Sequence, residues 1–124
     1  MFIRSSWDAR TASPGCAASW SALNPSQGQC AVTALLVQDI WGGQLIRTVV
    51  EGQSSHYYNL LPDGRELDLT RGQFPPGTVV PPGRPVERYY VLESEGAVRA
   101  RTADRYRVLK ARFDLMLYSV TCGC

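Results

Sequence analysis

The strongest hydrophobic pattern in the chain lies in residues 30–41, CAVTALLVQDIW. Its apolar side chains recur at the i, i+3, i+4, i+8 spacing of one helix face: Val32, Leu35, Leu36 and Ile40. Val37 and Trp41 widen that face, so we expect most of this helix to be buried. Gly42 and Gly43 follow directly, and glycine readily adopts the backbone geometry that ends a helix.

A second pattern predicts three strands and a tight turn. Gln44–Val50 is rich in β-branched residues, and Ser55–Leu61 and Arg65–Thr70 are short strand candidates on either side of residues 62–64 (Pro-Asp-Gly). Proline suits the first turn position, aspartate the second, and glycine the position that needs a positive φ. This order is typical of a three-residue hairpin loop, a type I turn closed by a glycine bulge.

The turn type predicts the register of the hairpin. A three-residue loop pairs residues whose numbers sum to 126, so His56 faces Thr70 and Tyr58 faces Asp68. Because side chains alternate along a strand, all four share one face of the sheet. His56 and Asp68 become diagonal neighbours, about 7–8 Å apart at the backbone and within side-chain reach. A two-residue loop would place them on opposite faces, so this prediction depends on the turn.

The remaining segments complete an α+β pattern. We expect a short helix over Ile3–Arg10, a proline-rich surface loop at residues 71–85 and a strand over Val86–Leu92. Residues 74–85 of this loop are expected to form one wall of a substrate cleft. Thr102 can cap a last helix that runs to about Tyr118. Its expected buried stripe is Tyr106, Leu109, Phe113, Met116 and Leu117. We expect the tail, residues 121–124, to be frayed.

Composition narrows the classes of protein to consider. The 124 residues carry 13 Lys+Arg against 11 Asp+Glu, a net charge of +2. This length predicts one domain over residues 1–124, and so small a charge gives no reason to expect a nucleic-acid partner. No apolar stretch approaches the ~18 residues needed to cross a bilayer, so we expect no membrane partner. Residues 1–6 lack the apolar region of a secretory signal, which favours a cytoplasmic location.

Cys30 and His56 are the candidate reactive pair. The chain has one histidine, so sites built from two or three histidines are excluded, whereas a cysteine–histidine pair is not. Cys30 opens the predicted helix, where free N–H groups and the helix dipole stabilise a thiolate and an oxyanion. His56 can take the thiol proton and return it to a leaving group. Asp68 can hold the imidazole's tautomer and stabilise its protonated form.

Other roles for these residues stay open at this point. Cys30 could be a small buried apolar residue, and Asp68 could cap a turn or pair with Arg65 or Arg71. Asn59 is a second candidate for orienting His56, although its place on the strand puts it on the opposite face. A zinc site would need His56 with three cysteines, but the Cys-x-Cys tail lacks the usual ligand spacing. The cysteines concerned are Cys16, Cys122 and Cys124. We therefore expect no metal and no cofactor.

Several of these motifs resemble the YunG family of small bacterial proteins. The resemblance covers roughly residues 20–75 and is carried by residues 24–34 (NPSQGQCAVTA), Gly42-Gly43, residues 55–59 (SHYYN), residues 63–70 (DGRELDLT) and Gln73-Phe74. The second half of this block also resembles the histidine strand and the Asp-Pro-Thr strand of papain-like and transglutaminase-like enzymes. Here that motif is Asp-Leu-Thr, without the proline.

The resemblance implies a papain-like (transglutaminase-like) α+β fold, in which the helix that bears the cysteine packs on a small antiparallel sheet and a helix ends the chain. It further implies a Cys30–His56–Asp68 triad. Papain-like enzymes supply a Gln or Asn side chain to the oxyanion hole from before the nucleophile. Gln29, Gln27 and Asn24 compete for that role here, and we favour Gln29.

The resulting hypothesis is a cysteine-dependent acyl-transfer enzyme that works through a thioester. Its partner would be a peptide, a protein or a small acyl substrate, and water or an amine would resolve the thioester. Hydrolysis would make it a hydrolase or thiol peptidase, and transfer to an amine a transglutaminase-like transferase. Two alternatives are a binding module that uses the same cleft without turnover and a small toxin or effector domain.

Overall fold

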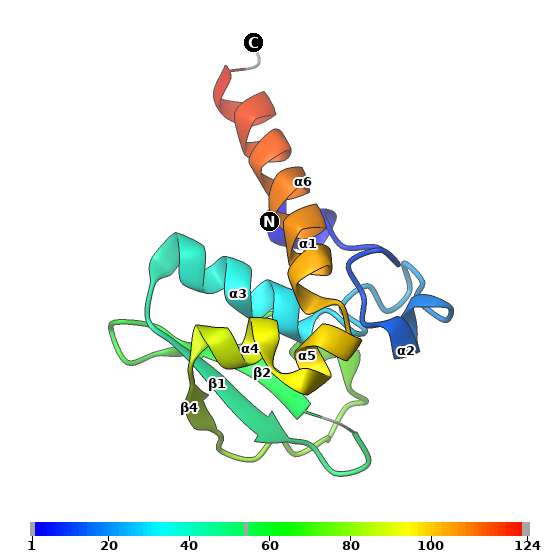
Figure 1. Cartoon of the computed structure of the whole chain (residues 1–124), viewed down its shortest axis with the longest axis vertical. Helices are drawn as coiled ribbons and strands as arrows, with labels where there is room; N and C mark the ends of the chain where they lie inside the picture. The colour runs from blue at the N-terminus through cyan, green and yellow to red at the C-terminus, as the bar shows by residue number, and fades with distance from the viewer. Residues whose placement is uncertain (1, 54, 123–124) are drawn as a thin grey trace.

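The computed structural model describes residues 2–53 and 55–122, with side chains described for residues 3–53 and 55–119. It is an α+β fold built around a small antiparallel sheet (Figure 1). The sheet has the strand order β3-β2-β1-β4. The strands are β1 (Gln44–Val49), β2 (Ser55–Leu60), β3 (Glu66–Leu67) and β4 (Arg84–Val86).

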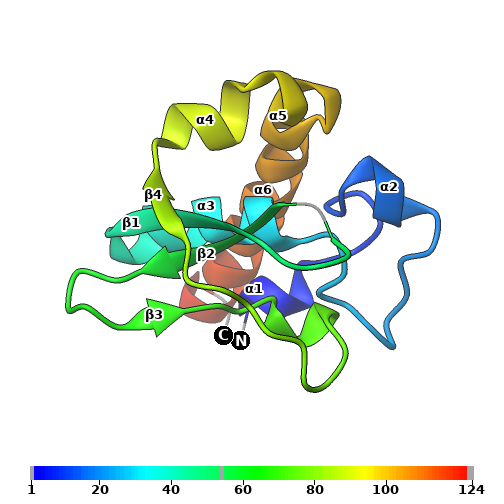
Figure 2. The ribbon, with the colours of Figure 1, turned by 90° about the horizontal axis from the view of Figure 1, so that it is seen from below.

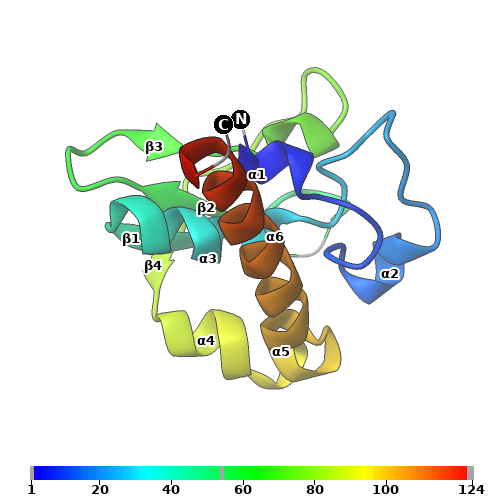
Figure 3. The same cartoon turned by 90° about the horizontal axis from the view of Figure 1, so that it is seen from above.

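Helix α3 (Cys30–Trp41) has the predicted bounds and lies between the sheet and the last helix, α6 (Thr102–Cys122). Leu35 and Val37 of α3 are fully buried, as the width of its apolar face predicts. Asn59 on β2 donates a hydrogen bond to the carbonyl of Ala34 at 2.9 Å, which ties the helix to the sheet. Figure 3 shows α6 crossing over α3, where Leu109 joins the core.

The hairpin has the predicted register. Asn59 pairs with Leu67, the N–H of Leu61 donates to the carbonyl of Arg65 at 2.8 Å, and Gly64 has φ 88°. The paired strands are shorter than predicted, because β3 ends at Leu67 and the chain then turns. The predicted pairing of Asp68 with Tyr58 is therefore not formed in the sheet.

The segment after the hairpin covers the sheet face that holds His56. It begins with a short 3₁₀ turn, η1 (Arg71–Gln73), and returns along the sheet to β4 (Figure 2). The N–H of Gly83 donates to the hydroxyl of Tyr58 at 3.2 Å. Gly83 lies so close to β1 that an added Cβ would meet the carbonyl oxygen of Arg47. These contacts hold the end of the segment against the sheet.

The predicted strand over Val86–Leu92 is wrong. The chain forms β4 only as far as Val86 and then helix α4 (Arg88–Glu93), followed by α5 (Glu95–Arg99). A short apolar run of this kind fits a strand or a buried helix equally well. The first residue of α4 ties this helix to α3, because the Arg88 guanidinium binds three groups there. They are the Leu35 carbonyl, the Gln38 amide oxygen and the Asp39 carboxylate.

The ends of the chain also differ from prediction. Helix α1 (Phe2–Ser5) stops before Arg10, because Asp8 and Thr11 form a local turn, and α2 (Pro14–Ala17) follows. Helix α6 continues past Tyr118 to Cys122, so that part of the predicted frayed tail is helical, and Gly123–Cys124 lie outside the described residues. The predicted stripe on α6 is buried at Leu109, partly buried at Tyr106 and Phe113, and exposed at Leu117.

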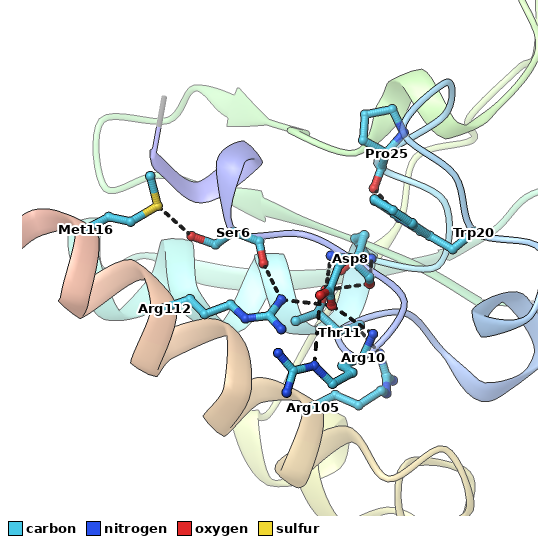
Figure 4. Close-up of polar contacts among 10 residues, drawn as sticks. Ser6, Asp8, Arg10, Thr11, Trp20, Pro25, Arg105, Arg112 and Met116 are labelled. Carbon is cyan, nitrogen blue, oxygen red and sulfur yellow. Dashed lines mark hydrogen bonds and ion pairs between the residues drawn. The ribbon is translucent and has the colours of Figure 1, made fainter.

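The N-terminal segment is held on α6 by an ion pair. Figure 4 shows Asp8 meeting Arg112, at 2.8 Å. The hydrogen bond from Arg112 holds the pKa of Asp8 below its usual value. Nowhere in residues 2–53 or 55–122 is a helix long and apolar enough to span a membrane.

Candidate functional site

Cys30 is the first residue of α3 and lies beside the first residues of β2. Its sulfur is 4.0 Å from the carbonyl oxygen of Ser55. The first N–H groups of a helix have no acceptor within it, so those at the start of α3 are available to a negative charge near the sulfur. Cys30 and His56 line the same pocket, of about 630 Å³.

His56 is buried, with 1% of its surface exposed, and is bound to Asp68. Its Nε2 lies 2.7 Å from an Asp68 carboxylate oxygen. The ring of Phe74 stands edge-on against the imidazole, with 5.0 Å between ring centroids and 75° between planes. Phe74 thus packs against the imidazole, and the hydrogen bond to Asp68 sets the orientation of the His56 ring.

The surroundings of His56 favour its protonated form. Burial by itself lowers the pKa of this imidazole, but the hydrogen bond to Asp68 and the interactions with Cys30 together raise it more strongly. The net result is a pKa of about 9 for His56, up from the ordinary 6.5. At neutral pH an imidazolium therefore lies beside the Cys30 sulfur, which is the arrangement of a thiolate–imidazolium pair.

The structure brings Cys30, His56 and Asp68 together and leaves Gln29 apart. Gln29 is fully buried, its amide nitrogen donates to the carbonyl of Asp8 at 3.0 Å, and it does not line the pocket. The two other candidates for the oxyanion hole also bind elsewhere. Gln27 contacts the hydroxyl of Ser19, and Asn24 donates to the carbonyl of Gln73.

Gln73, which the residue-by-residue reasoning did not select, carries a side-chain amide beside His56 in the pocket. Its nitrogen lies 3.4 Å from His56 Nδ1 and 3.3 Å from the Thr70 hydroxyl, and its oxygen accepts from the N–H of Gly28 at 3.3 Å. When His56 is protonated, Nδ1 becomes a donor, so the amide nitrogen loses this acceptor. Gln73 then has a donor to offer to a group bound at Cys30. The signal in the sequence was the Gln73-Phe74 pair in the block that resembles the YunG family.

The contacts in the structure argue against several of the alternative roles considered for Asp68, Asn59 and the proline-rich loop. Arg65 pairs with Asp63 at 2.7 Å, and Arg71 donates to the carbonyl of Thr78, so neither is the partner of Asp68. Asn59 is bound to α3 and faces away from His56, as predicted. Of the predicted wall at residues 74–85, Phe74 lines the pocket and the proline residues do not; Gln73, which directly precedes this range, also lines it.

No group of three or more potential metal ligands occurs among the described side chains. Cys122 and Cys124, two members of the zinc alternative, lie outside those side chains. Cys16 lines the same pocket as Cys30, and both are free thiols.

Fold and site together define an α+β protein with a helix-start cysteine beside a buried His–Asp pair. The chain belongs to the YunG family, since the family model described as YunG protein matches residues 1–118. A Bacillus subtilis (strain 168) protein, "Uncharacterized protein YunG", is 31% identical over 120 residues, which are 96% of this chain and 91% of that protein. No solved structure matches the chain.

Proposed function

We propose that this protein is a cysteine-dependent acyl-transfer enzyme that uses Cys30 as nucleophile, His56 as acid and base, and Asp68 to orient His56. The observation that carries the proposal is the buried His56, bound to Asp68 at 2.7 Å, in the pocket that Cys30 lines. Burying an ionisable pair is costly, and groups with strongly raised pKa values in a pocket are characteristic of catalytic sites. A structural His–Asp pair would need neither the cysteine nor the pocket.

In the proposed reaction the Cys30 sulfur attacks the carbonyl carbon of an amide, isopeptide or ester. The carbonyl oxygen takes the negative charge, which the N–H groups at the start of α3 and the Gln73 amide stabilise. His56 gives its proton to the leaving amine or alcohol as the carbon–heteroatom bond breaks, and a thioester remains on Cys30. His56 then removes a proton from water or an amine, which attacks the thioester. The carbon–sulfur bond breaks, so that the acid or the new amide is released and the Cys30 sulfur is free again.

The order of the elements supports a papain-like (transglutaminase-like) version of this fold. The cysteine helix α3 comes first, the histidine follows on β2, and the carboxylate lies just after the next strand, β3. His56 uses Nε2 toward Asp68, which leaves Nδ1 for the side of Cys30 and Gln73. A cytoplasmic location belongs to the same proposal, because a reducing compartment keeps a reactive thiol free.

The test is a mass-spectrometric screen for acyl adducts. The protein is incubated with libraries of peptides, amides and activated esters, and the peptide that contains Cys30 is examined for added acyl mass. We expect adducts on Cys30 in the native chain and none at this position in Cys30→Ser. Cys16 is a matched control thiol in the same pocket, and it should gain no adduct.

Adducts distributed equally over both cysteines would refute a specific nucleophile. Tight binding of library members without acylation would favour the non-catalytic binding module.

A pair of glutamine substitutions tests the source of the oxyanion donor. Gln73→Leu removes the amide that lies in the pocket, and we expect acylation of Cys30 to slow by about 100-fold, the usual effect of losing one such donor. Gln29→Leu removes a buried amide whose oxygen has no hydrogen-bond partner among the described residues, and we expect acylation to be unchanged and stability to change by about 1 kcal/mol. Acylation rates and urea unfolding measure the two effects. The reverse pattern would return the role to Gln29.

A further inference from the structure

The pocket beside Cys30 carries an excess of positive charge. Among its described lining residues are three arginines, Arg47, Arg99 and Arg105, and one acid, Glu95. Glu95 already pairs with Arg99 at 2.7 Å, where both side chains are exposed. Within the described part of the chain, Arg47 and Arg105 have no carboxylate partner. Two cations in this pocket thus lack a carboxylate partner among the described residues.

Arg105 is a buried cation that only neutral groups hold. It is 7% exposed and donates to the carbonyls of Thr11 and Ala100, each at 2.9 Å, and to the Thr102 hydroxyl at 3.3 Å. Figure 4 shows it reaching from α6 toward Thr11. Arginine stays charged even when burial lowers its pKa, as it does here. Burial of this charge outweighs the opposing interactions with Cys30 and Cys16, so Arg105 favours an anion that enters the pocket.

Arg47 is the more accessible of the two cations. It lies on β1 opposite Tyr57, its Nε donates to the Ser55 hydroxyl at 2.9 Å, and its guanidinium lies 5.7 Å from the centre of the Tyr90 ring. Ser55 connects it to the reacting sulfur, because the carbonyl of the same residue is 4.0 Å from Cys30 Sγ. No carboxylate within the described residues binds the two terminal nitrogens of Arg47, so a substrate carboxylate can bind them through two parallel bonds.

Aromatic rings complete this part of the pocket. Tyr57, Phe74 and Tyr90 line it together with the arginines. Burial raises the pKa of Tyr57, and Tyr90 and Cys30 add to that effect while Arg47 opposes it. The Tyr57 hydroxyl therefore stays neutral and can donate a hydrogen bond at neutral pH. The pocket thus offers one accessible guanidinium, a phenol donor and apolar ring faces.

We propose that this pocket selects acyl substrates that carry a carboxylate near the reacting carbonyl, and that Arg47 binds this carboxylate while Cys30 attacks. The accessible charge is that of one guanidinium, which matches a monoanionic carboxylate better than a dianionic phosphate. Arg105 also lines the pocket and adds a favourable potential, while its three nitrogens already donate to Ala100, Thr11 and Thr102. The inference deepens the proposed function, since it names the substrate class for the same nucleophile.

Iodoacetate and iodoacetamide test this preference with reagents of nearly equal size. In both, the Cys30 sulfur attacks the methylene carbon and iodide leaves, and only the carboxylate or amide differs. The measured quantity is the ratio of the two alkylation rates at Cys30, divided by the same ratio for N-acetylcysteine. We expect this normalised ratio to be about 10-fold or more in the native protein and to fall with added salt.

Substitutions at Arg47 identify the source of the ratio. Arg47→Gln should lower it by about 5–10-fold, and Arg47→Lys should lower it less, because lysine keeps the charge but cannot form the two parallel bonds. Arg4→Gln is the matched control, since Arg4 is an exposed arginine on α1 outside the pocket, and the ratio should not change. A change in sulfur reactivity alone cancels in the ratio, because both reagents report it.

The outcomes separate the inference from the function on which it rests. A ratio that Arg47→Gln leaves unchanged overturns the carboxylate subsite, even if Cys30 is an activated nucleophile. A ratio that His56→Gln abolishes and Arg47→Gln does not would assign the effect to the imidazolium. An Arg47-dependent ratio at a sulfur no more reactive than N-acetylcysteine would support the subsite and refute the proposed enzyme.

Discussion

Replacing His56 with glutamine is expected to slow the alkylation of Cys30 by iodoacetamide at pH 6 by about 10–30-fold. A cysteine without a partner, with a pKa of about 8.5, is only about 0.3% thiolate at that pH, whereas a cysteine paired with an imidazolium is mostly thiolate. This difference alone would give a larger factor. A more acidic thiol is also a weaker nucleophile for each thiolate, which reduces the gain about 10-fold.

The pH profile of alkylation gives the reason for the effect. His56 has a pKa of about 9, so the imidazolium persists across the neutral range and is lost only in alkaline solution. We therefore expect the native rate to change little between pH 6 and 8 and the His56→Gln rate to rise steeply with pH. N-acetylcysteine, a thiol without a protein partner, should follow the steep profile and serves as the reference. A profile for Cys30 in the native chain that matches that of N-acetylcysteine would show that His56 does not activate Cys30.

The part of the site that could be predicted from the sequence is the part that local geometry determines. The Pro-Asp-Gly turn at residues 62–64 sets the hairpin register, and the register brings Asp68 to the face of His56. The strand pairing ends one residue before Asp68, yet the two side chains still meet. Turn chemistry was therefore sufficient for this pair, even though the predicted strand was too long.

The remaining parts depend on packing between distant segments, which periodicity does not reveal. Gln29 directly precedes Cys30 in sequence, but its amide nitrogen donates to the Asp8 carbonyl in the N-terminal segment. Gln73 reaches the pocket because the chain turns after Thr70, 40 residues along the sequence from the start of α3. Proximity in sequence favoured Gln29, whereas the side-chain amide that lies beside His56 in the pocket is that of Gln73.

The arginines of the pocket illustrate the same limit. Arg47 is on β1, and Arg105 is on α6, so only the assembled fold brings them to the pocket of Cys30. Helix α4 contributes Tyr90 as the ring that faces Arg47, and the sequence pattern had assigned that segment to a strand. Neither the positive charge of the pocket nor helix α4 could be predicted from the sequence, because both depend on contacts between distant segments.

The Asp68→Asn variant is expected to lose stability mainly below pH 9, the region in which His56 is protonated. The folded-state pKa of His56 is raised from 6.5 to about 9, and the hydrogen bond to Asp68 is a main cause of the increase. A raised histidine pKa adds stability that is complete below pH 6.5 and disappears as the pH rises through about 9. The neutral amide of the variant would bind the imidazolium less strongly than the carboxylate does, so this contribution shrinks, by an amount on the order of 1–3 kcal/mol.

Urea unfolding of both proteins at pH 6 and pH 10 measures this loss. The difference in the free energy of unfolding between the native chain and Asp68→Asn should be largest at pH 6 and should narrow by pH 10. Asp63→Asn is the matched control, because Asp63 lies on the same hairpin but pairs with the exposed Arg65. The bonds from Arg65 lower the pKa of Asp63, so that carboxylate stays charged throughout the range and the control should show a constant difference. If the difference in the free energy of unfolding is also constant with pH for Asp68→Asn, Asp68 stabilises the fold without raising the pKa of His56. That result would contradict the presence of an imidazolium beside Cys30 at neutral pH.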